Sequence, residues 1–221
     1  MPSKPSAGRA LFIGVAVLVY YIFIWATSSG RLDFARSSSG SMKPTVRYEG
    51  GVLGGDRLLV DYGAYRDAPP KRGDIVVFST QGYPVLSAWS MGLKRVAGLP
   101  NEHVQIRPPS VYIDGKLLTN PAIFAQMAEK QHGYSGYFLA YSNVDLSAVL
   151  AHATDSYHVS EAGYFLLGDH SYGSIDSRYV GEINQTCILG RAIGIVWPPA
   201  RVVDFRHDPH AAIRGLNTAR R

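Results

Sequence analysis

The sequence predicts a mostly β domain that follows one membrane-spanning helix, and three observations lead to this fold class. Short apolar runs separated by Gly, Pro, Asn and Asp recur between residues 57 and 197, as is typical of strands joined by turns. The 23 glycines and 14 tyrosines of the 221-residue chain suit the same pattern. An uncharged run occupies residues 10–30. Because 46% of all residues are apolar and 18% are charged, the chain is neither disordered nor fully embedded in a membrane.

Residues 10–30 are predicted to form a membrane anchor. The run is 21 residues long, and a helix of about 20 residues crosses the hydrocarbon core. Tyr20, Tyr21 and Trp25 lie towards its far end, where aromatic side chains favour the membrane interface. A cleavable signal peptide is the alternative, but a cut after the run would fall almost on the serine-rich loop that follows. An uncleaved anchor is therefore favoured.

The charges on either side of this run predict its orientation. Lys4 and Arg9 favour a cytoplasmic N-terminus, whereas Arg31 and Arg36 on the far side oppose it. The expected arrangement is a single-pass protein of the inner (cytoplasmic) membrane, with its β domain on the outer, periplasmic face.

Residues 37–45, Ser-Ser-Ser-Gly-Ser-Met-Lys-Pro-Thr, form the loop around which the domain is expected to be organised. The small residues, the glycine and the proline favour a loop over the interior of a helix or strand. A serine hydroxyl on a tight loop beside a membrane is a candidate nucleophile. On this stretch alone, a flexible linker is the better interpretation.

After this loop the pattern is that of strands. They are expected at residues 57–60, 75–78, 93–96, 103–106, 164–167 and 188–197. The fully apolar run 75–78 suits a buried position in a sheet. Residues 111–117 predict a hairpin, because Asp-Gly between strand formers favours a type I′ turn. The pair Pro198-Pro199 is expected to end the regular structure.

The segment before residue 164 differs from the rest. Residues 121–132 are predicted to be helical, with Pro121 suited to the first turn. Residues 133–162 give no firm prediction, and residues 117–162 are interpreted as a small inserted α+β subdomain. The chain is predicted to divide into four parts. They are an N-terminal segment (1–9), the anchor (10–30), a β domain with this insertion (31–200) and a basic tail (201–221).

The net charge of +5 comes from scattered basic residues, and the densest group is Arg214, Arg220 and Arg221 in the tail. Anionic lipid headgroups explain such a balance as well as nucleic acid does, and no nucleic-acid partner is expected. Cys187 is the single cysteine, so an intrachain disulfide and a multi-cysteine metal site are excluded.

Lys94 is the second residue that carries candidate chemistry. It lies beside Arg95 in an apolar strand, whose successive side chains point to opposite faces. One of the two is therefore expected to face solvent, and the other the core or a cleft. Desolvation lowers the pKa of a lysine, and only the neutral amine can take a proton from a serine hydroxyl. For this strand taken alone, two edge-strand charges that discourage aggregation are the better interpretation.

The loop at residues 168–181, Gly-Asp-His-Ser-Tyr-Gly-Ser-Ile-Asp-Ser-Arg-Tyr-Val-Gly, is the third candidate segment. Ser174 can hold a neutral lysine amine in position by hydrogen bonding, and Asp176 and Arg178 can pair to stiffen the loop. A polar turn with local side-chain to backbone bonds is the plainer alternative.

A Ser/His/Asp triad built from Ser41, His170 and Asp169 is a further arrangement to consider. It is disfavoured, because adjacent residues rarely present the geometry that a base and the group orienting it require.

Four segments, in this order, resemble bacterial type I signal peptidases. They are Ser-Gly-Ser-Met-Lys-Pro-Thr (39–45), Arg-Gly-Asp-Ile-Val-Val-Phe (72–78), Leu-Lys-Arg-Val-Ala-Gly-Leu-Pro (93–100) and the 168–181 loop. The resemblance covers most of residues 37–197. It implies a mostly antiparallel β fold, a sheet or partial barrel, that carries a Ser/Lys dyad and needs no metal or cofactor.

The resemblance also implies a role for individual residues. Ser41 would be the nucleophile and Lys94 the general base. The Ser39 hydroxyl and the Ser41 backbone N–H resemble the family's oxyanion hole, and Ser174 would orient Lys94.

Five further residues match positions of the family outside the dyad. Asp176 and Arg178 would support the loop that carries Ser174. Met42, Val46 and Leu93 match positions that line the pocket for small substrate side chains.

The chain departs from the family pattern at three places. Ser38 stands where members often carry proline, and Asn101-Glu102 stands where Gly-Asp is usual after the lysine strand. His170 replaces the usual asparagine of the last motif. None of these changes removes an atom of the dyad. We therefore expect them to affect the rate or the specificity of the reaction sooner than its presence.

The resulting prediction is a membrane-anchored serine endopeptidase that removes signal peptides from pre-proteins through an acyl-enzyme. Its expected partners are pre-protein signal peptides and membrane lipid, and a monomer is expected. Three alternatives remain: a related peptidase that matures conjugative pilins, a self-cleaving Ser/Lys repressor, and a non-enzymatic anchored β scaffold. The Met-Lys-Pro-Thr continuation disfavours the pilin-maturing peptidase, and the membrane run disfavours the repressor. The presence of both dyad residues disfavours the non-enzymatic scaffold.

Overall fold

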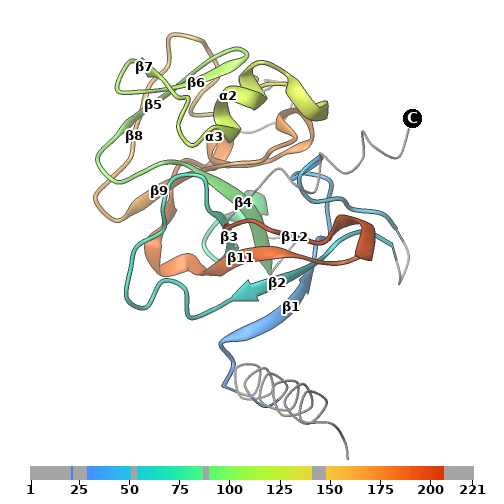
Figure 1. Cartoon of the computed structure of the whole chain (residues 1–221). Coiled ribbons are helices and arrows are strands. Elements are labelled where there is room, and N and C mark those ends of the chain that lie inside the picture. Colours follow the sequence, from blue (N-terminus) through green and yellow to red (C-terminus); the bar gives the residue numbers. More distant parts are fainter. Residues whose placement is uncertain (1–20, 22–28, 51–53, 87–89, 141–147, 207–221) are drawn as a thin grey trace, which may run out of the picture.

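The computed structural model describes residues 21, 29–50, 54–86, 90–140 and 148–206 (Figure 1). The predicted anchor at residues 10–30 lies outside this part except for Tyr21, Ser29 and Gly30. Among the described residues, no helix has the length and apolar character needed to cross a membrane.

Two antiparallel sheets organise the described chain. The larger follows the order β1-β2-β11-β3-β4-β9-β10, with β12 paired to β11. Its strands are β1 (Leu32–Arg36), β2 (Arg57–Asp61), β3 (Ile75–Ser79), β4 (Met91–Gly98), β9 (Gly163–Leu167), β10 (Ile183–Asn184), β11 (Ile188–Trp197) and β12 (Val203–Asp204). The smaller follows the order β7-β6-β5-β8, from β5 (His103–Arg107), β6 (Ser110–Ile113), β7 (Lys116–Leu117) and β8 (Tyr157–His158). The mostly β, antiparallel fold class is confirmed.

Every predicted strand is present, and burial follows the apolar patterns. Leu58 and Val60 of β2 are buried between exposed or half-buried neighbours, whereas all of Ile75–Phe78 in β3 is buried. The β6–β7 turn has positive φ at Asp114 (49°) and Gly115 (75°), as a type I′ hairpin requires. The short strands β1, β8, β10 and β12 were not predicted, because β1 has no regular alternation and the other three have only two residues each.

The smaller sheet and the short helix α2 (Ile123–Ala128) share one core, and Figure 1 shows them at one end of the domain. Ile123, Phe124 and Met127 of the helix pack with apolar residues of β5 and β6. The smaller sheet therefore draws on residues before position 117 as well as on the predicted insertion.

The helix predicted over residues 121–132 is too long. After α2, Lys130 (φ 54°) and His132 (φ 53°) adopt left-handed conformations that an α-helix does not contain. The turn brings Tyr134 and Tyr137 into the core, with 4% and 1% of their surface exposed. Burial of two aromatic rings outweighs local helix propensity here.

The prediction that Pro198-Pro199 ends the regular structure is wrong. A short 3₁₀ turn at Pro199–Arg201 reverses the chain, and β12 then pairs with β11. The Arg201 guanidinium, 5% exposed, donates to Asp56 Oδ1 (2.7 Å), to Asp56 Oδ2 (2.6 Å) and to the Thr45 carbonyl (3.0 Å). Arg201 thus belongs to the folded domain, and residues 207–221 of the predicted tail lie outside the described residues.

The departure at Asn101-Glu102 has a local explanation. Asn101 adopts φ 65°, a left-handed conformation that asparagine tolerates better than other non-glycine residues. The Glu102 carboxylate accepts a bond from the Leu99 N–H (2.7 Å) and pairs with Arg72. The turn after β4 therefore closes without the family's glycine and aspartate.

Candidate active site

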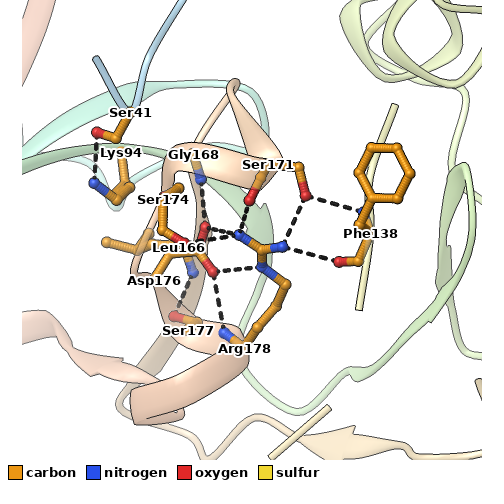
Figure 2. Close-up of polar contacts among 10 residues, drawn as sticks. All are labelled: Ser41, Lys94, Phe138, Leu166, Gly168, Ser171, Ser174, Asp176, Ser177 and Arg178. Carbon is orange, nitrogen blue, oxygen red and sulfur yellow. Dashed lines mark hydrogen bonds and ion pairs between the residues drawn. The ribbon is translucent and has the colours of Figure 1, made fainter. Parts of the chain in front are cut away.

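Ser41 and Lys94 point towards one another from different elements (Figure 2). Ser41 lies in the turn at residues 41–46, which the bond from the Val46 N–H to the Met42 carbonyl (2.9 Å) helps to close. Lys94 lies in β4. The Lys94 Nζ is 2.9 Å from the Ser41 Oγ, and the two residues are 5% and 7% exposed.

The environment of Lys94 favours its neutral form. Burial lowers the pKa of the Lys94 ammonium from its ordinary value to about 8. The buried charges of Asp176, Arg178 and Asp169 act on it in opposing directions and change it less than burial does. At pH 8 about half of the molecules therefore carry the free amine that a general base requires.

The expectation that either Lys94 or Arg95 faces solvent is wrong. Arg95 is 1% exposed, and its Nε and Nη2 donate to the two carboxylate oxygens of Asp169 at 2.8 Å and 2.6 Å. Its Nη1 donates to the Gly73 carbonyl at 2.8 Å. The two side chains do point to opposite faces of β4, but both faces are buried. Lys94 contacts Ser41, and Arg95 binds Asp169. The sequence offered no signal for this, because Asp169 is 74 residues away.

The same carboxylate accounts for the absence of a Ser/His/Asp triad. Asp169 binds Arg95 and also accepts a short hydrogen bond from the Thr45 hydroxyl. The His170 backbone N–H donates to the Ser41 carbonyl at 2.9 Å. His170 therefore contributes a backbone contact to the Ser41 loop, and Asp169 is committed elsewhere.

Asp176 and Arg178 form a buried ion pair behind the dyad (Figure 2). Arg178 donates through Nε and Nη2 to the two Asp176 oxygens at 2.8 Å and 2.9 Å. Burial raises the pKa of the Asp176 carboxyl, but the Arg178 guanidinium, the Gly168 N–H and the Ser174 side chain together hold that pKa below its ordinary value. Asp176 also accepts the Gly168 N–H (2.9 Å), so the pair fixes both ends of the 168–178 loop.

Arg178 ties this loop to a distant segment as well. It donates to the carbonyl oxygens of Phe138 (2.9 Å), Ser171 (2.7 Å) and Ser174 (3.0 Å), and to the Ser171 Oγ (2.7 Å). One guanidinium therefore satisfies several buried acceptors at once.

Ser174 lies beside the dyad but does not make the expected bond to Lys94. Its Oγ is buried, and none of the hydrogen bonds of the Lys94 amine goes to it. The Lys94 Nζ instead donates to the Ser41 Oγ and, at 3.2 Å, to the Leu93 carbonyl. Gly168 is what admits Ser174, because a Cβ there would meet the Ser174 Oγ and lie 2.7 Å from the Ser41 carbonyl oxygen.

The Ser39 hydroxyl lies 3.1 Å from the Ser41 Oγ. The neighbouring Ser37 hydroxyl turns away and donates to the Ser39 carbonyl at 2.8 Å. Of Ser37, Ser38 and Ser39, Ser39 is therefore the one whose hydroxyl adjoins the Ser41 hydroxyl. Its assignment to the oxyanion hole stays a prediction.

A cavity of about 390 Å³ opens beside the dyad. Of the three residues predicted to line the substrate pocket, Leu93 lines this cavity, and Met42 and Val46 do not. They are 1% and 0% exposed and belong to a core cluster against which Leu93 packs. Lining residues that sequence reasoning missed include Arg36, Tyr62, Leu86, Met91, Tyr172 and Tyr179. They come from separate segments, and only the fold brings them together.

In the described part of the chain, no group of three or more His, Cys, Asp or Glu side chains is placed to hold a metal ion. The polar groups around Ser41 are hydroxyls, one lysine amine and backbone groups. Their arrangement suits proton transfer and attack by a hydroxyl.

Comparison with known proteins gives matches over most of the chain. Residues 8–197 match the family model described as "Signal peptidase, peptidase S26". The chain is 32% identical over 165 residues to "Probable signal peptidase I-2" of Synechocystis sp., spanning 74% of this chain and 62% of that protein. It is 30% identical over 216 residues to "Signal peptidase I" of Leptolyngbya laminosa, spanning 94% and 90%. It is 31% identical over 150 residues to "Signal peptidase I V" of Bacillus subtilis, spanning 68% and 77%.

Proposed function

The chain belongs to the signal peptidase family, peptidase S26, and we propose that it is a membrane-anchored endopeptidase that removes N-terminal signal peptides from exported pre-proteins. Its class, a serine endopeptidase, follows from the family and the named relatives. We further propose which residues react, that residues 10–30 anchor the chain, and that its substrates are exported pre-proteins.

The observation that carries the proposal is the contact between Ser41 and Lys94. A serine hydroxyl is a weak nucleophile unless a base takes its proton. The Lys94 amine lies within hydrogen-bond distance of it, at 2.9 Å, and burial brings the pKa of that amine to about 8. Distance and protonation state both support Lys94 as the general base.

The reaction proceeds in two halves. Neutral Lys94 takes the Ser41 proton while the Oγ attacks the scissile carbonyl, and the lysine ammonium then protonates the leaving amine. The acyl-enzyme is hydrolysed when the same amine, neutral again, activates a water molecule. The Ser41 backbone N–H and the Ser39 hydroxyl stabilise the oxyanion in both halves, and losing one such donor typically costs about 100- to 1000-fold in turnover.

An open strand edge beside the dyad supports an extended substrate. Met91–Lys94 of β4 pairs with β3 on one side, whereas pairing with β9 on the other side begins at Arg95. No strand of the described residues covers that side of Met91–Lys94. A peptide in extended form can add to such an edge, and Leu93 and Met91 of the same segment line the cavity.

The anchor completes the proposal. The uncharged run at residues 10–30 ends two residues before β1 begins at Leu32, and β1 leads directly into the Ser41 loop. A membrane helix in this position would hold the dyad close to the bilayer, where signal peptides emerge. The basic excess of the chain suits contact with anionic lipid.

The test is cleavage of a purified pre-protein in detergent or liposomes by the full chain and by Lys94→Ala, with N-terminal sequencing of the product. The proposal expects one cut after the signal peptide by the wild type and none by the variant. Equal cleavage by both proteins, or no cut within the signal region, would contradict it.

A further inference from the structure

Thr45 lies near the end of the turn at residues 41–46, the Ser41 turn, and its buried hydroxyl has two partners. It donates a short hydrogen bond to Asp169. The Tyr134 hydroxyl lies 2.7 Å from the same Thr45 Oγ. A threonine hydroxyl carries one hydrogen, and an ionised carboxylate carries none. The Thr45 hydrogen therefore goes to Asp169, and Tyr134 donates to Thr45.

The Asp169 carboxylate joins the two elements that carry the dyad. On one side it accepts the bond from Thr45, in the Ser41 turn. On the other side it accepts two bonds from Arg95, which follows Lys94 in β4, at 2.8 Å and 2.6 Å. The position of Thr45 on this carboxylate therefore sets where Ser41 lies relative to Lys94.

Tyr134 reaches the Thr45 hydroxyl from the segment interpreted as an insertion. Its buried ring packs in the core that α2 shares with the smaller sheet. The residue before it lies against the nucleophile loop, because a Cβ at Gly133 would be 3.9 Å from the Pro44 ring. Through the Tyr134 hydroxyl, the core of the smaller sheet is thus bonded to the Ser41 turn.

We propose that Tyr134 is a positioning residue, whose hydroxyl holds Thr45 and so keeps the Ser41 turn at its distance from Lys94. The Lys94 Nζ and the Ser41 Oγ are 2.9 Å apart. A misplacement of about 1 Å between reacting groups can cost about 100-fold in rate. The inference rests on the proposed function, because it concerns the geometry of the same dyad. It gives a role in the reaction to a residue outside the motifs that resemble the family.

The same core offers a matched control. Tyr137 is buried in the same cluster, and its hydroxyl donates to the Met127 sulfur at 2.9 Å. Tyr134→Phe and Tyr137→Phe each remove one buried hydroxyl and keep the ring that fills the core. Both should lower the melting temperature by a similar amount, but only Tyr134→Phe releases the Ser41 turn.

The first experiment measures kcat and KM of the full chain in detergent, with a quenched-fluorescence peptide that carries a signal-peptide cleavage site. Tyr134→Phe should lower kcat by about 10- to 100-fold with little change in KM, because the dyad is displaced and the cleft is kept. Tyr137→Phe should keep the kcat of the wild type. Equal kcat in wild type and Tyr134→Phe, equal losses in the two variants, or a change confined to KM would overturn the inference.

A second set of variants tests whether Tyr134 acts through Thr45. Thr45→Ser keeps the hydroxyl and should keep most of the activity. Thr45→Val keeps the shape without the hydroxyl and should lose at least as much kcat as Tyr134→Phe. The double variant should be no slower than Thr45→Val alone, since the acceptor of the Tyr134 hydroxyl is already gone. Losses that multiply in the double variant would show that the two residues act independently and would overturn the inference.

Hydrogen exchange separates this inference from the proposed function, because it needs no cleavage. The Val46 and His170 amide protons, both bonded to carbonyls of the Ser41 turn, should exchange faster in Tyr134→Phe than in wild type or Tyr137→Phe. If exchange changes in this way but the wild type cuts no peptide, the proposed function fails and the hold of Tyr134 on the turn stands. If the wild type cuts the peptide and Tyr134→Phe alters neither exchange nor kcat, the inference is wrong and the peptidase assignment stands.

Discussion

The Lys94 Nζ and the Ser41 Oγ lie 2.9 Å apart, although 53 residues separate them in the chain. Two features of the fold create this contact. The bond from His170 N–H to the Ser41 carbonyl ties the serine loop to the 168–178 loop, and β4 carries Lys94 to the same place. Burial of the amine lowers its pKa to about 8 and so favours the neutral form that the proposed proton transfer requires.

The serines of the loop should differ sharply in importance. Ser41→Ala should abolish cleavage, because it removes the attacking oxygen. Ser39→Ala should lower turnover by about 100- to 1000-fold, as loss of an oxyanion donor does. Ser37→Ala and Ser38→Ala should keep most of the activity, and the Ser37 hydroxyl faces the Ser39 carbonyl instead. Turnover of one pre-protein by the four variants checks the order, and wild-type activity in Ser41→Ala would exclude it as the nucleophile.

Gly168→Ala should inactivate the enzyme without unfolding it. The new Cβ would collide with Ser174 and lie 2.7 Å from the Ser41 carbonyl oxygen, so the two loops must separate. A shift of about 1 Å between catalytic groups can cost about 100-fold in rate. Gly50→Ala is the control, because nothing lies within 4 Å of a Cβ there and its φ is ordinary. Similar cleavage rates for the two folded variants would show that the close approach is not required.

Asp176→Asn should destabilise the domain. The substitution keeps the shape of the side chain but leaves the buried Arg178 guanidinium without its counter-charge, which typically costs about 3–5 kcal/mol. For a chain of this size, thermal melts should then show a melting temperature lower by about 6–20 °C. Asp67→Asn, at an exposed position, should change it little.

The pH dependence of this pair has a definite sign. Because the pKa of Asp176 is lowered in the folded state, its contribution is present at neutral pH. It is lost only as the pH falls through that lowered value. A gap between wild type and Asp176→Asn that narrows near pH 7, and not in acid, would contradict this account.

The anchor can be tested on the protein in cells. If residues 10–30 span the membrane uncleaved, the mature protein should begin at Met1 or Pro2 and resist carbonate extraction. Protease added to spheroplasts should digest the chain beyond Arg31. An N-terminus between residues 26 and 36 would identify a cleaved signal peptide. Full protection from protease would show that the orientation is opposite to the one predicted.

Local sequence patterns predicted most of the strands, because apolar periodicity and turn residues depend on only a few neighbouring positions. They did not predict how distant charges pair. Arg95 is buried because Asp169 meets it, and Arg201 is buried because Asp56 does. The edge-charge interpretation of Lys94 and Arg95 failed because it considered one segment alone.

The pocket residues show the same limit. The resemblance placed Met42 and Val46 in the substrate pocket, yet both are buried in the core behind it, and Leu93 alone of the three lines the cavity. Ser174 was expected to bond to Lys94, and its hydroxyl is buried beside the amine without making that bond. A motif gives the neighbourhood of a residue, and packing decides which atoms face the substrate.

The central claim is that neutral Lys94 takes the proton of Ser41, and the pH dependence of single-turnover acylation tests it most directly. The wild-type rate should rise along one ionisation near pH 8 and then level off, because the pKa of the amine is lowered to about 8. Lys94→Arg should be inactive at every pH, since guanidinium stays protonated. A wild-type rate that climbs to pH 10 without a plateau, or an active Lys94→Arg, would contradict the assignment.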